Sequence, residues 1–354
     1  MMTKVWVVKF FVLTFLFIGS IGIINYAVDP LQQYRQARFY KPVFSLERYL
    51  NPGLAKTYDY NSVITGSSMV ENFIISNVSS ILTISKPIKL CMSGASAHDI
   101  KYILDVSFKN KQLDSVIYGL DLYAFSGTPT KLGFGEGSIP SYLYDDNYLN
   151  DYQYLLNIDT LKNVSRVLIK NRLQPHDPLL DFDTMYQWQL QYKNDFGKDN
   201  VMEQWKRWKK DQKNLVLDEY SYETLIKSFE YNFLPFVKKY KNTKFYIFYP
   251  PYSMLAYKDM QDKRWFKDGM EFKRYVYTTL KKYSNVKIYD FQVAKEFTHD
   301  LKNYRDPTHY HQSINKWMLL QIKDENYLLN DENIDSNIQE LVEQVNAYSV
   351  PKIR

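Results

Sequence analysis

The chain has 354 residues, of which 45% are hydrophobic, 17% aromatic and 24% charged. This length fits one large domain or two ordinary ones, and the composition is that of a folded protein. The net charge of +6 is spread along the chain, without a basic stripe interleaved with aromatics or a zinc-ligand spacing, so a nucleic-acid partner is not indicated. The single cysteine, Cys91, excludes an intrachain disulfide and C-x-x-C chemistry.

The first predicted element is a membrane-spanning helix. Residues 10–28, FFVLTFLFIGSIGIINYAV, carry no charge, and a helix of this length extends roughly 28 Å, enough to cross a bilayer core. Lys4 and Lys9 precede the segment and two arginines follow it, which modestly favours a cytoplasmic N-terminus. The segment is longer than a usual signal-peptide core, and NYA is a poor cleavage sequence. We expect an uncleaved signal-anchor, with the following residues outside the cytoplasm; a buried first helix, the alternative, has no equally apolar partner.

The body of the chain is predicted to be an α/β domain. Short apolar runs end at turn residues and alternate with helical patterns, which is typical of a mostly parallel sheet with crossover helices. The expected strands are Asn61–Thr65, Ile88–Met92, Ser115–Leu120, Lys244–Tyr249 and Val286–Tyr289. The expected crossover and final helices are His98–Lys109, Glu271–Tyr283 and one that begins near His311.

Between the third and fourth strands lies a long segment that is rich in Tyr, Asn and Trp and mostly helical in pattern, for instance over Tyr154–Lys170 and Tyr222–Tyr240. An insertion of this size usually forms a lid or a substrate-specific subdomain. An acidic tail follows the last strand region and includes a possible surface helix at Ile338–Val345. The predicted organisation is an anchor (1–28), a connector (29–57), an α/β domain (58–125 and 241–322), a helical insertion (126–240) and a tail (323–354).

Two adjacent hydroxyls stand where the first strand is expected to end, in the sequence YNSVITGSSMVENF at residues 60–73. Glycine and serine suit tight bends and helix N-caps, so Ser67 and Ser68 could serve turn chemistry alone. The alternative is a nucleophile presented at the end of a sheet. The choice between them depends on whether a base and an orienting acid occur elsewhere.

One of the five histidines lies at a spacing from an aspartate that would let the two side chains act as an acid–base pair. In YRDPTHYHQS, Asp306 precedes His309 by three residues on a loop stiffened by Pro307, so the carboxylate can accept the Nδ1 proton and leave Nε2 as a base. This loop follows the last predicted strand, and reactive groups of open parallel sheets gather at the carboxyl ends of strands. His311 is an alternative base, without the three-residue offset. Taken singly, each of these residues could also be an ordinary turn or surface residue.

The pattern of G-x-S after a first strand and D-x-x-H before the last helix resembles the SGNH (GDSL-like) hydrolase superfamily. It is most similar to the membrane-anchored branch of D-alanyl transfer proteins of teichoic-acid modification and exopolysaccharide O-acetylation proteins. The similarity extends to three further motifs, which read Val28-Asp29-Pro30, GLDLYAF at 119–125 and YPPYS at 249–253. It covers about residues 25–125 and 243–320. It implies a three-layer, flavodoxin-like, mostly parallel α/β fold.

The resemblance also implies roles for single residues. Ser68 would be the nucleophile, Asp306 the orienting acid and His309 the base. The backbone N–H groups of Gly94, in MSGAS, and of Ser68 would form the oxyanion hole. Asp121 takes the place of the oxyanion asparagine of the family, and because a carboxylate is a poor oxyanion donor, we expect it to fix a loop or bind a polar acceptor. Ser67 stands where the family often has aspartate.

These observations predict a membrane-anchored, extracytoplasmic O-acyltransferase that modifies a cell-surface polysaccharide or related polymer through an acyl-serine. No metal, nucleotide or other cofactor is expected. The expected partners are the membrane, a glycan or polymer acceptor and, by resemblance, a multi-pass membrane acyltransferase that supplies the acyl donor. Three alternatives remain open: an esterase with the same residues, a non-catalytic glycan-binding or assembly subunit, and a cytosolic hydrolase with a misinterpreted N-terminus.

Overall fold

The structure is a computed structural model, and it describes residues 2–133, 139–192, 195–211 and 217–351. The chain divides into two compact units. Unit 1 comprises Met1–Asp59 and Ile139–Met185, and unit 2 comprises Tyr60–Ser138 and Tyr186–Arg354. The predicted insertion is therefore shared between the units. The predicted domain boundaries stay a prediction.

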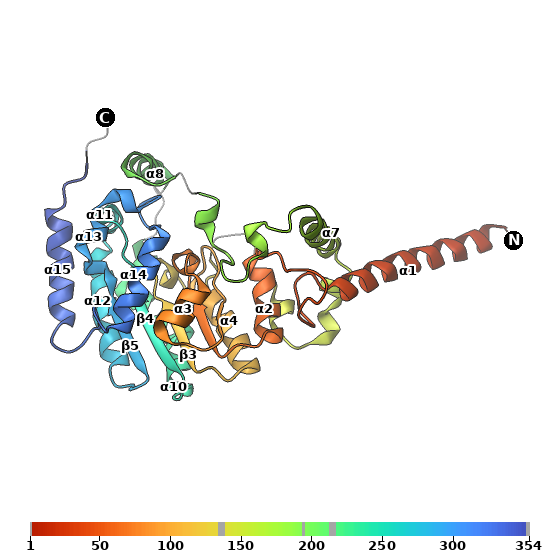
Figure 1. Ribbon diagram of the computed structural model, residues 1–354, viewed down its shortest axis with the longest axis horizontal. Coiled ribbons are helices and arrows are strands. Elements are labelled where there is room, and N and C mark those ends of the chain that lie inside the picture. Colours follow the sequence, from red (N-terminus) through yellow and green to blue (C-terminus); the bar gives the residue numbers. More distant parts are fainter. Residues whose placement is uncertain (1, 134–138, 193–194, 212–216, 352–354) are drawn as a thin grey trace. The chain divides into compact units, whose positions relative to one another are not determined.

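Unit 2 contains a five-stranded parallel sheet with the order β2-β1-β3-β4-β5. Figure 1 labels β3, β4 and β5 of this sheet. The strands are β1 Ser62–Thr65, β2 Pro87–Lys89, β3 Ser115–Gly119, β4 Lys244–Tyr249 and β5 Val286–Asp290. They confirm the predicted α/β class and lie at the predicted places, with β2 beginning and ending earlier than expected. The three central strands are almost entirely buried, which explains their short, continuous apolar sequences.

Helices cover both faces of this sheet. Helix α3 packs against α14, whereas α9 packs against both α4 and α12. Crossovers between parallel strands are right-handed, so α3, which leads from β1 outward to β2, lies opposite the helices of the other connections. The helices of unit 2 are α3 Ile75–Leu82, α4 Ala97–Asn110, α8 Lys198–Asp211, α9 Tyr222–Asn232, α10 Leu234–Lys239, α11 Met254–Asp262, α12 Phe266–Leu280, α13 Lys295–Thr298, α14 Gln312–Lys323 and α15 Ile334–Ala347.

The strand order places a topological switch point between β1 and β3, at the carboxyl ends of these strands. The connections of β1 and β3 leave these neighbouring strands in opposite directions, because β2 lies on one side of β1 and β4 lies beyond β3. In open α/β sheets, such a switch point leaves a crevice at the carboxyl ends of the strands. The predicted nucleophile turn follows β1, and Asp121 follows β3, so both lie at this point.

Unit 1 is helical in its regular elements. Its helices are α1 Met2–Val28, α2 Glu47–Thr57, α5 Ser141–Tyr144, α6 Tyr152–Leu155 and α7 Ile158–Leu173. Helix α1 is long and apolar enough to span a membrane over Lys4–Val28, a criterion that a signal sequence also meets. The predicted connector contains α2, which has a proline, Pro52, inside it.

Two predicted helices are each interrupted in the structure. The helix expected over Tyr154–Lys170 is divided into α6 and α7, because the Asn157 side chain accepts a hydrogen bond from the Asp159 N–H (2.7 Å) and caps a new helix. The helix expected over Tyr222–Tyr240 breaks at Phe233, and Pro235 occupies the first turn of α10. Both interruptions follow from local capping rules that periodicity alone does not detect.

Candidate active site

The turn after β1 gives its two serines different tasks. Gly66 has φ +151°, a conformation that favours glycine, and it redirects the chain from β1 into a 3-10 turn over Ser68–Val70. Ser67 caps this turn, since its hydroxyl accepts from the Met69 N–H (3.4 Å), and its side chain is buried. Turn chemistry therefore occupies Ser67 and leaves the neighbouring Ser68 hydroxyl available.

The Ser68 hydroxyl meets the predicted base, although 241 positions separate them in the chain. Ser68 Oγ lies 2.8 Å from His309 Nε2. His309 Nδ1 in turn lies 2.7 Å from Asp306 Oδ2. This hydrogen-bonded line has the order nucleophile, base and acid that an activated serine requires. Its catalytic use is a proposal, which is argued below.

The DPTH loop is preorganised by its own sequence. The other carboxylate oxygen of Asp306, Oδ1, accepts the N–H groups of Thr308 and His309, both at 2.9 Å, and the Thr308 hydroxyl at 3.1 Å. Ser253, at the start of α11, donates its N–H and its hydroxyl to the Pro307 carbonyl at 3.1 and 2.7 Å. The loop is thus held by its own hydrogen bonds and by hydrogen bonds from the YPPYS segment after β4. The sequence analysis did not predict this contact of Ser253.

The electrostatics of this pair favour a strong base with an ionised partner. Burial raises the pKa of Asp306, but the neighbouring His309 and three donated hydrogen bonds outweigh it and hold the pKa well below the ordinary range. Burial lowers the pKa of His309, but the Asp306 carboxylate outweighs it, and the pKa is raised. Both side chains are about a quarter exposed (25% and 22%), so solvent can reach them.

Two backbone N–H groups are available near the nucleophile. Gly94 lies in the loop after β2 with φ +59°, and it lines the same cavity as Ser68. Within the described residues, the N–H groups of Gly94 and Ser68 donate no hydrogen bond to another protein group. Donors of this kind, fixed in place before the reaction, are what stabilises a developing oxyanion. The arrangement agrees with the predicted position of Gly94, and its role stays a prediction.

Asp121 links three loops at the carboxyl edge of the sheet. Its Oδ2 accepts the Ser67 hydroxyl at 2.6 Å, and its Oδ1 accepts the Tyr252 hydroxyl and the Tyr123 N–H (3.0 Å). The side chain therefore acts as an acceptor in each of these contacts and braces the nucleophile turn against the loops after β3 and β4. Of the two roles expected for Asp121, the geometry supports that of fixing a loop.

A short segment of the predicted insertion packs beside the base. The indole N–H of Trp188 donates to the Ser68 carbonyl (3.2 Å), and its ring stands edge-on to His309 with centroids 5.3 Å apart. Gln189 contacts His311 Nε2 at 2.8 Å, and Nδ1 of His311 caps α14 by accepting the Ser313 N–H. Both nitrogens of His311 are thus engaged away from Ser68, which favours His309 as the base. No spacing in the sequence indicated Trp188.

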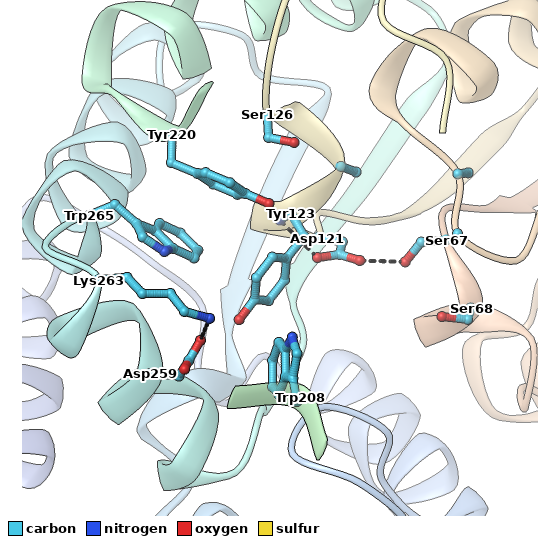
Figure 2. A pocket seen from close by; sticks show the side chains of 13 residues that line it. Ser67, Ser68, Asp121, Tyr123, Ser126, Trp208, Tyr220, Asp259, Lys263 and Trp265 are labelled. Carbon is cyan, nitrogen blue, oxygen red and sulfur yellow. Dashed lines mark hydrogen bonds and ion pairs between the residues drawn. The ribbon is translucent and has the colours of Figure 1, made fainter. Parts of the chain in front are cut away.

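A cavity of about 240 Å³ opens beside Ser68 (Figure 2). Aromatic side chains form part of its wall: Tyr220 stacks on Trp265 with centroids 4.5 Å apart, and Tyr123 stands edge-on to Trp265. Its polar groups include an ion pair between Asp259 and Lys263, at the side of the cavity away from Ser68. Its lining residues are Ser67, Ser68, Gly94, Ala95, Asp121, Tyr123, Ala124, Ser126, Trp208, Tyr220, Asp259, Lys263 and Trp265.

The Tyr123 hydroxyl is buried and has no hydrogen-bond partner among the described residues. It points toward the Asp259–Lys263 pair and Trp208 in Figure 2. A buried donor without an acceptor is costly.

A second hollow of about 410 Å³ lies on the side of the base. It is lined by Gln204, Arg207, Trp208, Asp306, Pro307, Thr308 and His309, so Trp208 forms a wall of both spaces. The candidate catalytic line thus has space on its Ser68 side and on its His309 side. Within the described parts of the chain, no group of three or more His, Cys, Asp or Glu side chains is placed to hold a metal ion.

Comparison with known proteins yields no family. No protein-family model matches the chain, and no curated protein matches it by sequence. Among solved structures, one match is a protein described as "a putative platelet activating factor from Streptococcus pneumonia", with 11% identity and a TM-score of 0.36. That match covers 80% of this chain and 91% of the other. A likeness this slight supports no conclusion about the present chain.

Proposed function

We propose that this protein is a membrane-anchored serine acyltransferase that acts outside the cytoplasm and moves an acyl group onto a hydroxyl of a cell-surface polysaccharide. The observation that carries the proposal is the line from Ser68 Oγ to His309 Nε2 (2.8 Å) and from His309 Nδ1 to Asp306 (2.7 Å). These distances lie within the reach that proton transfer requires. The apolar helix α1 supports the anchor.

In the first half-reaction, Ser68 Oγ attacks the carbonyl carbon of an acyl ester or thioester while His309 Nε2 takes the hydroxyl proton. The carbonyl oxygen becomes an oxyanion, which accepts hydrogen bonds from the N–H groups of Ser68 and Gly94. The Asp306 carboxylate accepts a hydrogen bond from the Nδ1–H group of His309 and stabilises the imidazolium. When the tetrahedral intermediate collapses, His309 returns its proton to the departing alcohol or thiol and an acyl-serine remains.

In the second half-reaction, an acceptor hydroxyl enters beside His309, which removes its proton as the oxygen attacks the acyl-serine. The same two N–H groups hold the new oxyanion. Collapse restores the Ser68 hydroxyl with the proton from His309 and releases the new ester. The chemistry therefore requires only a base that alternates between neutral and protonated forms, which the Asp306 partner favours.

The cavity supports a saccharide as the group bound beside Ser68. A volume of about 240 Å³ corresponds to roughly eight water molecules at their share of liquid volume, far more than an acetyl group needs. Flat aromatic walls suit the apolar faces of a sugar ring, while the unpaired Tyr123 hydroxyl and the Asp259–Lys263 pair suit its hydroxyls. A purely hydrocarbon acyl chain would leave the buried Tyr123 hydroxyl unpaired.

An esterase that uses the same residues is the second candidate. The observation that favours it is the hollow at His309, because that side chain is about a quarter exposed and water can approach the base. The two activities differ only in which hydroxyl attacks the acyl-serine. Incubation with an activated acetyl ester, with and without oligosaccharides, separates them: acetylated oligosaccharide supports transfer, and free acetate alone under every condition excludes it.

The acyl-serine itself is tested by covalent labelling with a serine-reactive phosphonate. We expect the wild-type protein to be labelled and Ser68→Ala to remain unlabelled while keeping its thermal stability. Ser67→Ala is the matched control: it removes the neighbouring hydroxyl, which caps the turn and contacts Asp121, but keeps the Ser68 hydroxyl, so labelling should persist, at a reduced rate. Labelling that persists in Ser68→Ala, or that never occurs in the wild type, would contradict a catalytic role and favour a non-catalytic binding subunit.

A further inference from the structure

In unit 1, the segment from Tyr148 to Leu173 exposes an unusual number of large apolar side chains. Leu149 is 88% exposed, and Leu173 is 73% exposed. The exposed set is Tyr148, Leu149, Tyr152, Leu156, Ile158, Leu168, Ile169 and Leu173. Scattered apolar residues on a surface need no explanation, but so many within one short stretch of α6, α7 and the preceding turn indicate a surface that meets something apolar.

Helix α7 combines this apolar character with positive charge. At 100° per residue, Ile158, Ile169 and Leu173 fall within about 60° of one another on the helix, and Lys162 falls among them. Lys162 is paired with Asp159, whereas Arg166 and Arg172 are exposed and form no ion pair with any described residue. Apolar side chains interleaved with cations on one helical face are typical of helices that lie in the interface of a bilayer with anionic lipids.

The segment is attached to the end of α1 by specific contacts. The buried Asn25 side chain donates from Nδ2 to the carbonyls of Leu155 (2.8 Å) and Asn157 (3.0 Å), at the junction of α6 and α7. The Tyr154 hydroxyl donates to Asp29 Oδ1 at 2.9 Å. Asp29, which directly follows α1, also accepts the N–H groups of residues 33–35. The α6–α7 junction is therefore joined to the last turns of α1 by hydrogen bonds.

These contacts set the depth of the segment. A Cβ atom added at Gly22 would lie 3.1 Å from Leu156 Cδ2, so the exposed Leu156 side chain runs alongside α1 at that level. Gly22 precedes the end of α1 at Val28 by six residues, or about 9 Å along the axis. Interfacial helices bury their apolar faces about 5–10 Å into the boundary between headgroups and acyl chains. If α1 spans the bilayer and ends near its surface, Leu156 lies at this depth.

We propose that the 148–173 segment is a second membrane contact of unit 1, which lies in the outer lipid interface with its apolar side chains among the acyl chains and its cations at anionic headgroups. The inference rests on the membrane anchor of the proposed function and is independent of the acyl-transfer chemistry. Two attachments, one that spans the bilayer and one that lies in its surface, fix the orientation of unit 1 relative to the membrane.

The test uses the full-length protein reconstituted in vesicles, with Cys91 replaced by alanine and a fluorophore on a single introduced cysteine. Labels at Leu149→Cys and Ile169→Cys are compared with a label at Phe15→Cys, within α1, which serves as the reference for a lipid environment. We expect nitroxide-bearing lipids to quench the first two labels to an extent approaching that at Phe15, and iodide to quench them several-fold less than a free fluorophore. Full quenching by iodide at Leu149 and Ile169, with Phe15 in lipid, would overturn the proposal and point to water or a protein partner there.

The role of charge is tested in the Leu149→Cys background. With vesicles that contain anionic lipid, Arg166→Glu combined with Arg172→Glu should restore iodide quenching, and with neutral lipid it should change little. Lys238→Glu with Lys239→Glu on α10 is the matched control, because it changes the net charge equally at a site in unit 2. Equal effects of the two double variants would contradict a local headgroup contact. A label at Phe15 that iodide quenches would refute the anchor, and this inference with it, while leaving the phosphonate test of Ser68 unaffected.

Discussion

The hydroxyls of the adjacent residues Ser67 and Ser68 contact different partners. The Ser67 hydroxyl is bound to Asp121 (2.6 Å) and caps a turn, whereas the Ser68 hydroxyl faces His309. Turn chemistry and a nucleophile, between which the sequence left the choice open, are thus not exclusive explanations: Ser67 serves the turn, and Ser68 remains available for the proposed role. The proposed proton relay depends on a carboxylate that is itself held by three hydrogen bonds.

Replacing that carboxylate should alter the pH profile as well as the rate. The acid limb of acyl-enzyme formation reports His309, which is an active base only when neutral, so activity rises as pH increases through the His309 pKa. Because the Asp306 charge raises this pKa, Asp306→Asn should move the acid limb to lower pH. The same change should lower kcat by about a thousandfold or more, since the Nδ1 proton loses its charged partner.

The measurement is the rate of hydrolysis of an activated acetyl ester between pH 4 and 9, buffered at constant ionic strength. Asp300→Asn, a neighbouring turn aspartate that caps a 3-10 turn, is the control and should leave the profile unchanged. An acid limb that stays in place in Asp306→Asn, or moves to higher pH, would show that Asp306 does not act on the base as proposed.

The Tyr123 hydroxyl provides a test of the saccharide cavity. Tyr123→Phe removes only the unpaired donor, so KM for an oligosaccharide acceptor should rise by roughly five- to thirtyfold, as expected for the loss of about 1–2 kcal/mol of hydrogen bonding. Hydrolysis of a small acetyl ester should not change. Tyr249→Phe is the control, because that hydroxyl is also buried without a described partner but does not line the cavity. An unchanged acceptor KM would show that the sugar does not bind in this cavity.

At the scale of elements, the turn after β1 depends on close packing as well as on backbone freedom. A Cβ atom at Gly66 would lie 3.1 Å from the Gly119 carbonyl oxygen and 3.1 Å from Val70 Cγ1, in addition to the strain of φ +151°. The turn that presents Ser68 is therefore tied to the end of β3. The β1–β3 switch point is set by contacts between strand ends, so we expect a side chain at Gly66 to disturb it.

Gly66→Ala should lower the free energy of unfolding by about 1–3 kcal/mol through this strain and should weaken phosphonate labelling by displacing Ser68. Gly269→Ala in α12 is the matched control. Its new Cβ would meet only ordinary contacts, 3.6 Å or longer, and alanine favours a helix, so stability should be equal or slightly higher. Chemical denaturation of both variants gives the comparison, and equal stabilities would refute the role assigned to Gly66.

At the scale of the whole molecule, two units carry the two halves of the proposed function. The candidate catalytic residues lie in unit 2, and the apolar helix lies in unit 1. The predicted insertion contributes to both units, since α7 packs on α1 whereas Trp188 packs beside His309. Residues of the predicted insertion therefore belong to both compact units.

The anchor is tested by charge. Leu16→Lys with Phe17→Lys places two cations in the middle of α1, at a cost of roughly 2.5–3.5 kcal/mol each in a membrane. The variant should appear in the soluble or alkali-extracted fraction, whereas wild type and the control Leu16→Ala with Phe17→Ala should remain with membranes after alkaline extraction. Extraction of the wild-type protein would favour a cleaved signal sequence or a soluble protein.

The sequence by itself determined the features that depend on near neighbours. The apolar run of α1, the buried strands, and the Asp306–His309 offset within one short loop all follow from local periodicity and spacing. The positions of the strands were predicted well because the strands are short, mostly apolar runs. Two helical segments were each predicted as continuous, but a side-chain cap at Asn157 and a break at Phe233, followed by a proline, divide each of them into two helices.

Only the tertiary structure decided which distant groups meet. Ser68 and His309 converge because the ends of parallel strands share one edge of the sheet, a contact between residues far apart in the chain that local patterns do not encode. The same holds for Ser253 on the DPTH loop, for Trp188 at the base and for Asp121 beneath Ser67. Such contacts arise from the packing of whole elements, and their residue types alone leave many partners equally plausible.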